Sequence, residues 1–346
     1  DISSNYLSNN SYGYNPYYGY GGYPYYGGYG GYGYGYGYGY GNYGNYELAY
    51  DPDKSIMMFG LSAGYGKRLN WPDDYFQFMA TLNYQLYMMK DWDYFLVNNG
   101  NCHNINLELN LQRNSIDNPL YTRKGSQFMF SVAATPPWSL WDGKDYKNMS
   151  DQDEAKFRMI EYHKWKFKAK TFTPLTSAES QHTLVLMTRA EVGILGSYNR
   201  HKRSPFETFY VGGDGMSGYS YNYATETIAL RGYENGSLTN AGSSFIAPKS
   251  SDASLYSKFT MELRYPISLA QSATIYALGF LEAGNSWYEL KDFEPFNLYR
   301  SAGVGLRVFL PMFGLLGIDW GYGFDDVPGR SGAGGSQFHF VLGQEF

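Results

Sequence analysis

The chain ends in GSQFHFVLGQEF, Gly335 to Phe346, and this stretch decides the fold. Its large apolar residues share one parity and are Phe338, Phe340, Leu342 and Phe346. The polar residues Gln337, His339 and Glu345 share the other parity. Such alternation is what a strand needs when one face meets lipid and the other a polar lumen. The terminal aromatic residue favours the closing strand of a bacterial outer-membrane β-barrel over the alternative, the last strand of a soluble sandwich.

The same alternation recurs through the rest of the chain and predicts an all-β, antiparallel transmembrane barrel, with no convincing helix after Ser55. Eleven strands are expected, at residues 55–67, 74–89, 101–113, 125–136, 158–173, 181–197, 255–266, 270–284, 299–310, 313–324 and 335–346. Bacterial single-chain barrels have an even number of strands. We therefore interpret the sequence as a C-terminal fragment that lacks its first strands.

One strand shows which face is polar. Residues Lys164, Lys166, Lys168 and Lys170 share a face opposite Trp165 and Phe167. Four lysines turned to lipid would cost about 2–4 kcal/mol each near the bilayer midplane. We expect the lysine face to look into water. The connections between strands alternate between short and long, as in outer-membrane barrels with short periplasmic turns and long extracellular loops.

Composition bounds the domains and partners. Residues 1–50 are rich in Tyr and Gly, including GYGYGYGYGY at 31–40, and are expected to form a low-complexity extracellular loop segment, with the barrel at 51–346. The net charge of −5 argues against a nucleic-acid partner. The single cysteine, Cys102, cannot form an internal disulfide. The first residues, DISSNYLSNN, have no signal-peptide pattern, so the start of an exported protein would be missing.

The longest connection, at 199–254, contains FYVGGDGMSGYSYNYATETIALRGYENGSLTN, Phe209 to Asn240. Its core is Leu230, Arg231, Gly232, Tyr233 and Glu234. This motif resembles the sixth extracellular loop of the BamA-like outer-membrane insertase family, in which a hydrophobic-Arg-Gly-aromatic motif folds back into the lumen. Four further stretches agree with the family in the same order: RNSIDNPLYTRKGS, IEYHKWKF, GIDWGYGFD and the C-terminal strand. The resemblance implies that the eleven strands are the last of sixteen.

An arginine placed in a barrel lumen needs carboxylate partners. The two strands after the loop offer Glu262 and Glu282, which stand where the family places the acidic partners of the loop arginine. Glu262 is opposite in parity to Met261 and Leu263, so it is expected to point inward. For Glu282 parity is less clear, because both faces of its strand are fairly apolar. Gly232 allows a tight backbone turn at the loop tip.

The sequence contains no convincing enzyme motif. The stretch GDGMSG at 213–218 fits G-x-G-x-x-G, but no βαβ unit surrounds it. The five histidines lack metal-ligand spacing, and no nucleophile with a paired base is visible. We predict no enzymatic activity and no cofactor.

The resemblance implies a barrel of the outer-membrane assembly machinery, located in the bacterial outer membrane. Such a barrel inserts and folds other outer-membrane proteins through a lateral seam. Its expected partners are unfolded outer-membrane proteins, the lipid bilayer and accessory lipoproteins. Gly343 and Gln344 would weaken the closing strand at that seam. Two alternatives stay open: a polypeptide-secreting pore of the same superfamily, and a passive porin or receptor.

Overall fold

The computed structural model describes residues 55–91, 97–151, 153–177, 180, 182–214, 225–239, 253–270, 272–312 and 314–342. Within these ranges eleven antiparallel strands form one sheet, in the order β1-β2-β3-β4-β5-β6-β9-β10-β11-β12-β13. The strands are β1 (Ser55–Arg68), β2 (Phe76–Lys90), β3 (Gly100–Asn114), β4 (Gly125–Ala134), β5 (His163–Pro174), β6 (Val185–Gly196), β9 (Leu255–Ala270), β10 (Ala273–Trp287), β11 (Tyr299–Leu310), β12 (Gly314–Gly323) and β13 (Gly335–Leu342).

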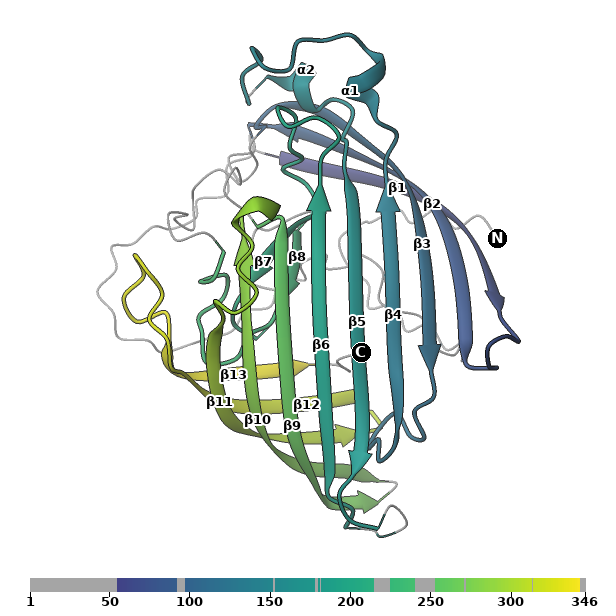
Figure 1. The fold of residues 1–346 in the computed structure, drawn as a ribbon, viewed down its shortest axis with the longest axis vertical. Coiled ribbons are helices and arrows are strands. Elements are labelled where there is room, and N and C mark those ends of the chain that lie inside the picture. Colours follow the sequence, from purple (N-terminus) through teal and green to yellow (C-terminus); the bar gives the residue numbers. More distant parts are fainter. Residues whose placement is uncertain are drawn as a thin grey trace.

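The sheet curves strongly around one side, as a partial barrel does (Figure 1). Within the described residues it is not closed, and β1 and β13 form its two edges. Two four-residue strands, β7 (Thr208–Val211) and β8 (Thr225–Ile228), pair in parallel as a separate small sheet. The remaining elements are the short helices α1 (Trp138–Trp141) and α2 (Glu154–Phe157) and a 3-10 turn, η3 (Leu290–Asp292). Among the helices that the structure describes, none has the length and apolar character to cross a membrane.

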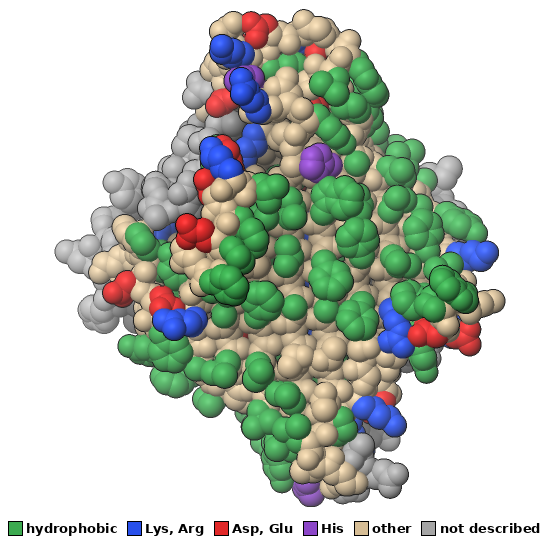
Figure 2. Space-filling model, viewed as in Figure 1, with side chains coloured by type: hydrophobic (Ala, Val, Ile, Leu, Met, Phe, Trp, Pro, Cys, Tyr) green, Lys and Arg blue, Asp and Glu red, His purple; other side chains and the backbone are tan. Residues whose placement is uncertain are grey.

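The two faces of the sheet have opposite chemistry, and the apolar face points outward. Trp165, Phe259 and Phe338 on three different strands are 43%, 44% and 67% exposed. Figure 2 shows hydrophobic side chains spread over the centre of this face, with most charged side chains near its margins. The inner face carries buried polar and charged side chains, including Asn104 and Lys164. A water-soluble sheet would bury the apolar face, so this inverted pattern identifies a membrane-spanning barrel wall.

An apolar cluster lies on the inner side, between the wall and the long connection from β6 to β9. It contains Tyr87 of β2, Phe206, Phe209, Leu230 and Tyr256, all at most 3% exposed. These residues come from strands on both halves of the sheet and from the loop that carries the predicted motif. The cluster therefore packs the loop against the barrel wall.

All eleven predicted strands are confirmed, with shifts at their ends. The predicted strand at 158–173 begins instead at His163, because the chain before it forms α2 and then an isolated bridge from Met159 to His103. The expectation of no helix after Ser55 is wrong for α1, α2 and η3, which are each one turn and too short to show a helical period. The Tyr/Gly segment at 1–50 lies outside the described residues.

Candidate functional site

The connection between β6 and β9 turns back along the inner face of the sheet. The amide N–H of Phe209 donates to the Ala253 carbonyl at 2.9 Å, which ties β7 to the chain just before β9. Gly213 and Leu230 exchange two backbone hydrogen bonds, of 3.1 and 3.0 Å. Leu230 and Tyr233 are fully buried. This framework presents the segment Leu230–Glu234, which we call the loop tip, to the last strands of the barrel.

Arg231 binds three carboxylates on three strands. Its Nη2 lies 2.7 Å from Glu262 Oε1 on β9 and 2.8 Å from Glu282 Oε1 on β10. Its Nη1 lies 3.1 Å from Asp319 Oδ2 on β12. Its backbone N–H also donates to Glu282 Oε2 at 2.8 Å. The guanidinium stacks over the buried Phe280 ring, with 3.6 Å between Cζ and the ring centroid.

Such geometry uses the planar fork of an arginine, which a lysine cannot reproduce. Burial on its own would lower the pKa of Arg231, but Glu282, Glu262 and Asp319 raise that pKa well above its ordinary value. The side chain is therefore a permanent cation in the lumen.

Each of the three carboxylates also has a cation partner on the wall itself. Arg264 donates two hydrogen bonds to Glu262 Oε2, at 2.8 and 2.6 Å. Arg307 pairs in a bidentate manner with Asp319, at 2.5 and 2.7 Å. The third pair joins Lys258 Nζ to Glu282 Oε1 at 3.3 Å. The charges of Glu262, Glu282 and Asp319 are therefore balanced by cations of the barrel wall even without Arg231.

Gly232 passes the chain close to the backbone of β12. It has φ +86°, and a Cβ there would come within 2.7 Å of Gly323 N. Gly321 faces it just as closely, since a Cβ at that position would lie 2.8 Å from Gly232 N. The amide N–H of Gly232 donates to His339 Nε2 on β13 at 2.8 Å. The loop tip therefore contacts the last described strand as well as β12.

Tyr233 and Glu234 complete the docking of the tip. The Tyr233 hydroxyl donates to the Arg300 carbonyl at 2.7 Å and accepts from the Asp325 amide at 3.3 Å. The Glu234 amide donates to the Ala333 carbonyl at 2.8 Å, while its side chain is exposed. Tyr233 thus fixes the tip to β11 and to the connection after β12, and Glu234 contributes through its backbone.

The structure brings together six of the predicted residues around one charge cluster: Leu230, Arg231, Gly232, Tyr233, Glu262 and Glu282. The inward orientation of Glu282, which parity left unclear, is established by its bonds to Arg231.

Sequence reasoning missed Asp319 and His339. Asp319 shares its inward parity with glycines, so a lone acid on a small-residue face was the available signal. Among the predicted seam residues, Phe338, Phe340 and Leu342 point outward and are 67%, 56% and 68% exposed. Gly343, Gln344 and Phe346 lie outside the described residues.

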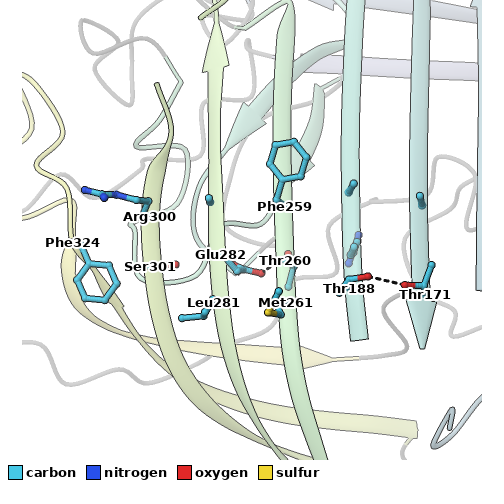
Figure 3. A pocket seen from close by; sticks show the side chains of 14 residues that line it. Thr171, Thr188, Phe259, Thr260, Met261, Leu281, Glu282, Arg300, Ser301 and Phe324 are labelled. Atoms are coloured by element: carbon cyan, nitrogen blue, oxygen red, sulfur yellow. Dashed lines mark hydrogen bonds between the residues drawn. The ribbon is translucent and has the colours of Figure 1, made fainter. Parts of the chain in front are cut away.

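A hollow of about 710 Å³ lies on the outer face beside this cluster. Figure 3 shows Phe259, Met261 and Leu281 at its lining, with Thr171 and Thr188 joined by a hydrogen bond of 2.6 Å. The lining is chiefly apolar. The charge cluster lies on the inner side of the same strands, because Glu262 and Glu282 alternate with these outward side chains. The hollow is thus part of the lipid-facing surface.

A curved antiparallel wall with an apolar outer face, a charged inner face and a loop latched inside by an arginine defines a transmembrane β-barrel with an inward-folded loop. The chain belongs to the Omp85 superfamily: the Omp85 superfamily domain matches residues 3–346. No curated protein sequence matches the chain.

The solved structures that are similar to this chain include the following two. BamA from Haemophilus ducreyi lacking POTRA domains 1-3 matches with a TM-score of 0.56 and 17% identity, over 83% of this chain and 54% of that one. CdiB from Escherichia coli matches with a TM-score of 0.43 and 12% identity, over 82% of this chain and 44% of that one. The chain therefore spans about half the length of these structures. The likeness to the first shows a BamA-like barrel fold.

Proposed function

We propose that this barrel inserts and folds outer-membrane proteins in the bacterial outer membrane. Unfolded outer-membrane proteins are its substrates, and they enter the bilayer through a lateral seam beside β13. A strand edge with free N–H and C=O groups pairs with an incoming strand by β-augmentation. Accessory lipoproteins that deliver substrates belong to this proposal.

The observation that carries the proposal is the contact between the loop tip and β13. Among the described strands β13 forms one edge of the sheet and pairs with β12. The hydrogen bond from Gly232 N to His339 Nε2 links that edge strand to the Arg231 cluster. A strand that serves as a template has to be held in place while its outer edge stays available. The loop tip supports β13 from the inner side through this hydrogen bond.

A disulfide across the seam tests the proposal in the complete protein. Cysteines are introduced at Gln344 and at positions along the strand that closes the barrel against β13, with Cys102 replaced by Ala. Insertion of a model outer-membrane protein into proteoliposomes is measured before and after oxidation. We expect insertion to stop when the seam is locked and to return on reduction.

The matched control locks two strands that do not separate in this mechanism. Val304 and Trp320 are direct partners across β11 and β12 and face outward. A disulfide between cysteines at these two positions should leave insertion unchanged. Full insertion with a locked seam would contradict the proposal. If a secreted polypeptide also crosses the locked barrel, the lumen is the working route and the protein is a secretion pore.

A further inference from the structure

The lysine face of β5 is covered by two glutamates of the β6–β9 connection. Lys164 is 3% exposed, although its parity predicted contact with water. Its Nζ lies 3.3 Å from Glu207 Oε2 and 3.0 Å from Glu226 Oε2. Glu207 directly precedes β7, and Glu226 is the second residue of β8. The small parallel sheet β7–β8 is therefore held to β5 by charge.

Glu226 is shared by three successive lysines of the β5 face. Besides Lys164, its carboxylate lies 3.2 Å from Lys166 Nζ and 3.7 Å from Lys168 Nζ. Burial raises the pKa of Glu226, but Lys166, Lys164 and Lys168 together bring it well below its ordinary value. The Glu226 carboxylate is therefore charged at neutral pH. A single acid among three cations is held by the whole row, because no one lysine supplies all of the attraction.

The backbone at Glu207 is held in an unusual conformation. Its φ is +67°, in the left-handed region that side chains other than glycine rarely adopt. Such strain is unfavourable and persists only where surrounding contacts enforce it. The enforcing contacts here are the pair with Lys164 and the entry into β7. The conformation points the carboxylate of Glu207 at the wall.

An apolar contact supports the ion pairs. Phe209 of β7 is fully buried and packs edge-on against Tyr256 of β9, with 4.7 Å between ring centroids. Lys164 Nζ lies 4.8 Å from the centroid of the Phe209 ring. Gly193 of β6 leaves room for both rings, since a Cβ there would collide with Tyr256 and Phe209. The wall thus has a shaped seat for β7 next to its lysine row.

We propose that Glu226 and Glu207, with the β5 lysines, form a second anchor that positions the base of the loop, separately from the Arg231 latch at its tip. The strands that each anchor uses are different: β5 for the base, and β9, β10 and β12 for the tip. Holding the base limits where the tip can go. Any effect of this anchor on insertion rests on the proposed function. The existence of the anchor does not, because it is argued from the ion pairs alone.

Limited proteolysis of the complete protein in outer-membrane vesicles tests the anchor. Glu226→Gln removes the charge and keeps the shape of the side chain. We expect the rate at which proteinase K cleaves the β6–β9 connection to rise about tenfold, less than for a fully buried pair because Glu226 is partly exposed. Glu226→Asp keeps the charge and should restore most of the protection. Glu289→Gln removes an exposed pair with Lys291 and is the matched control.

The barrel itself should stay folded in every variant, as shown by unchanged heat-modifiable migration in gels. Equal cleavage rates for wild type and Glu226→Gln would overturn the anchor. Equal loss of protection in Glu226→Asp and Glu226→Gln would show that charge is not what holds the loop, and would overturn it too. Faster cleavage with normal insertion activity would support the anchor while counting against a need for the loop in insertion, so the two proposals fail separately.

Discussion

Replacing Arg231 by Ala removes every ion pair between the loop tip and the wall. The side chain donates one hydrogen bond each to Glu262, Glu282 and Asp319. Hydrogen bonds to charged groups are each worth about 1.5–3 kcal/mol. Removal of one partner from a buried pair costs roughly 3–5 kcal/mol, chiefly because the other charge is left alone. Here that penalty is reduced, since each acid keeps its own wall cation.

We therefore expect Arg231→Ala to weaken loop docking by about 3 kcal/mol, at the low end of that range. This corresponds to about a 100-fold larger population of undocked loop. When the loop opens and closes faster than it is cut, cleavage tracks that population. The assay is the rate of proteinase K cleavage within the β6–β9 connection, measured in outer-membrane vesicles, with insertion activity measured in parallel.

Two further variants sharpen the test. Arg231→Lys keeps the charge but cannot reach three carboxylates at once, so it should give an intermediate rate. Lys291→Ala removes the exposed pair between Lys291 and Glu289 and should have little effect, because surface pairs are worth about 0–1 kcal/mol. Normal protection of the loop in Arg231→Ala would refute the reasoning. So would unfolding of the barrel, because it would show that the wall acids depend on the loop for neutralisation.

Three other changes should also alter loop docking. Gly232→Ala places a Cβ against the β12 backbone at φ +86° and should loosen the tip by about 1–3 kcal/mol, seen as faster cleavage. His339→Leu removes the acceptor of the Gly232 amide, whose hydrogen exchange should then accelerate while the Arg231 pairs persist. Because the pKa of Glu226 is lowered in the folded protein, its stabilisation is complete above the usual carboxyl pKa of 4.5 and is lost as pH falls through the lowered value. Exchange protection of β8 should then stay constant from about pH 8 to pH 5 and fall only in stronger acid; a loss near neutral pH would contradict this assignment.

Alternation along the chain predicted the strands because a membrane-spanning wall leaves one face in lipid, and this shows in most strands, although both faces of β10 are fairly apolar. It could not predict β7 and β8, since four residues are too few for a period to appear. The motif and the following strands indicated Arg231 with Glu262 and Glu282, which are near in sequence. Asp319 joins them only through strand register, which places it opposite Gly305 of β11 and three strands beyond Glu262.

The lysine row of β5 shows a different limit of sequence reasoning. Parity correctly placed Lys164 and its neighbours on the inner face. What covers that face depends on where a long connection folds, and Glu226 is far along the chain from Lys164. Neither the periodicity of the sequence nor the spacing of its charges predicts the pair between Lys164 and Glu226, because this pair forms only after the loop has turned back.

The charges around the tip favour a latch that can be released. Without Arg231, three wall acids face three wall cations, Arg264, Arg307 and Lys258. A site that relied on the loop for neutrality would leave buried acids unpaired whenever the loop moved, at a cost of several kcal/mol. Here the loop adds a fourth cation to a wall that is already balanced, so its departure leaves no acid alone.

Displacement of β13 at an opening seam would break the Gly232–His339 bond first, and undocking of the tip would in turn free β13 to move. By that reciprocity, a substrate strand paired to β13 should raise the cleavage rate of the loop in wild type and have no effect in Arg231→Ala.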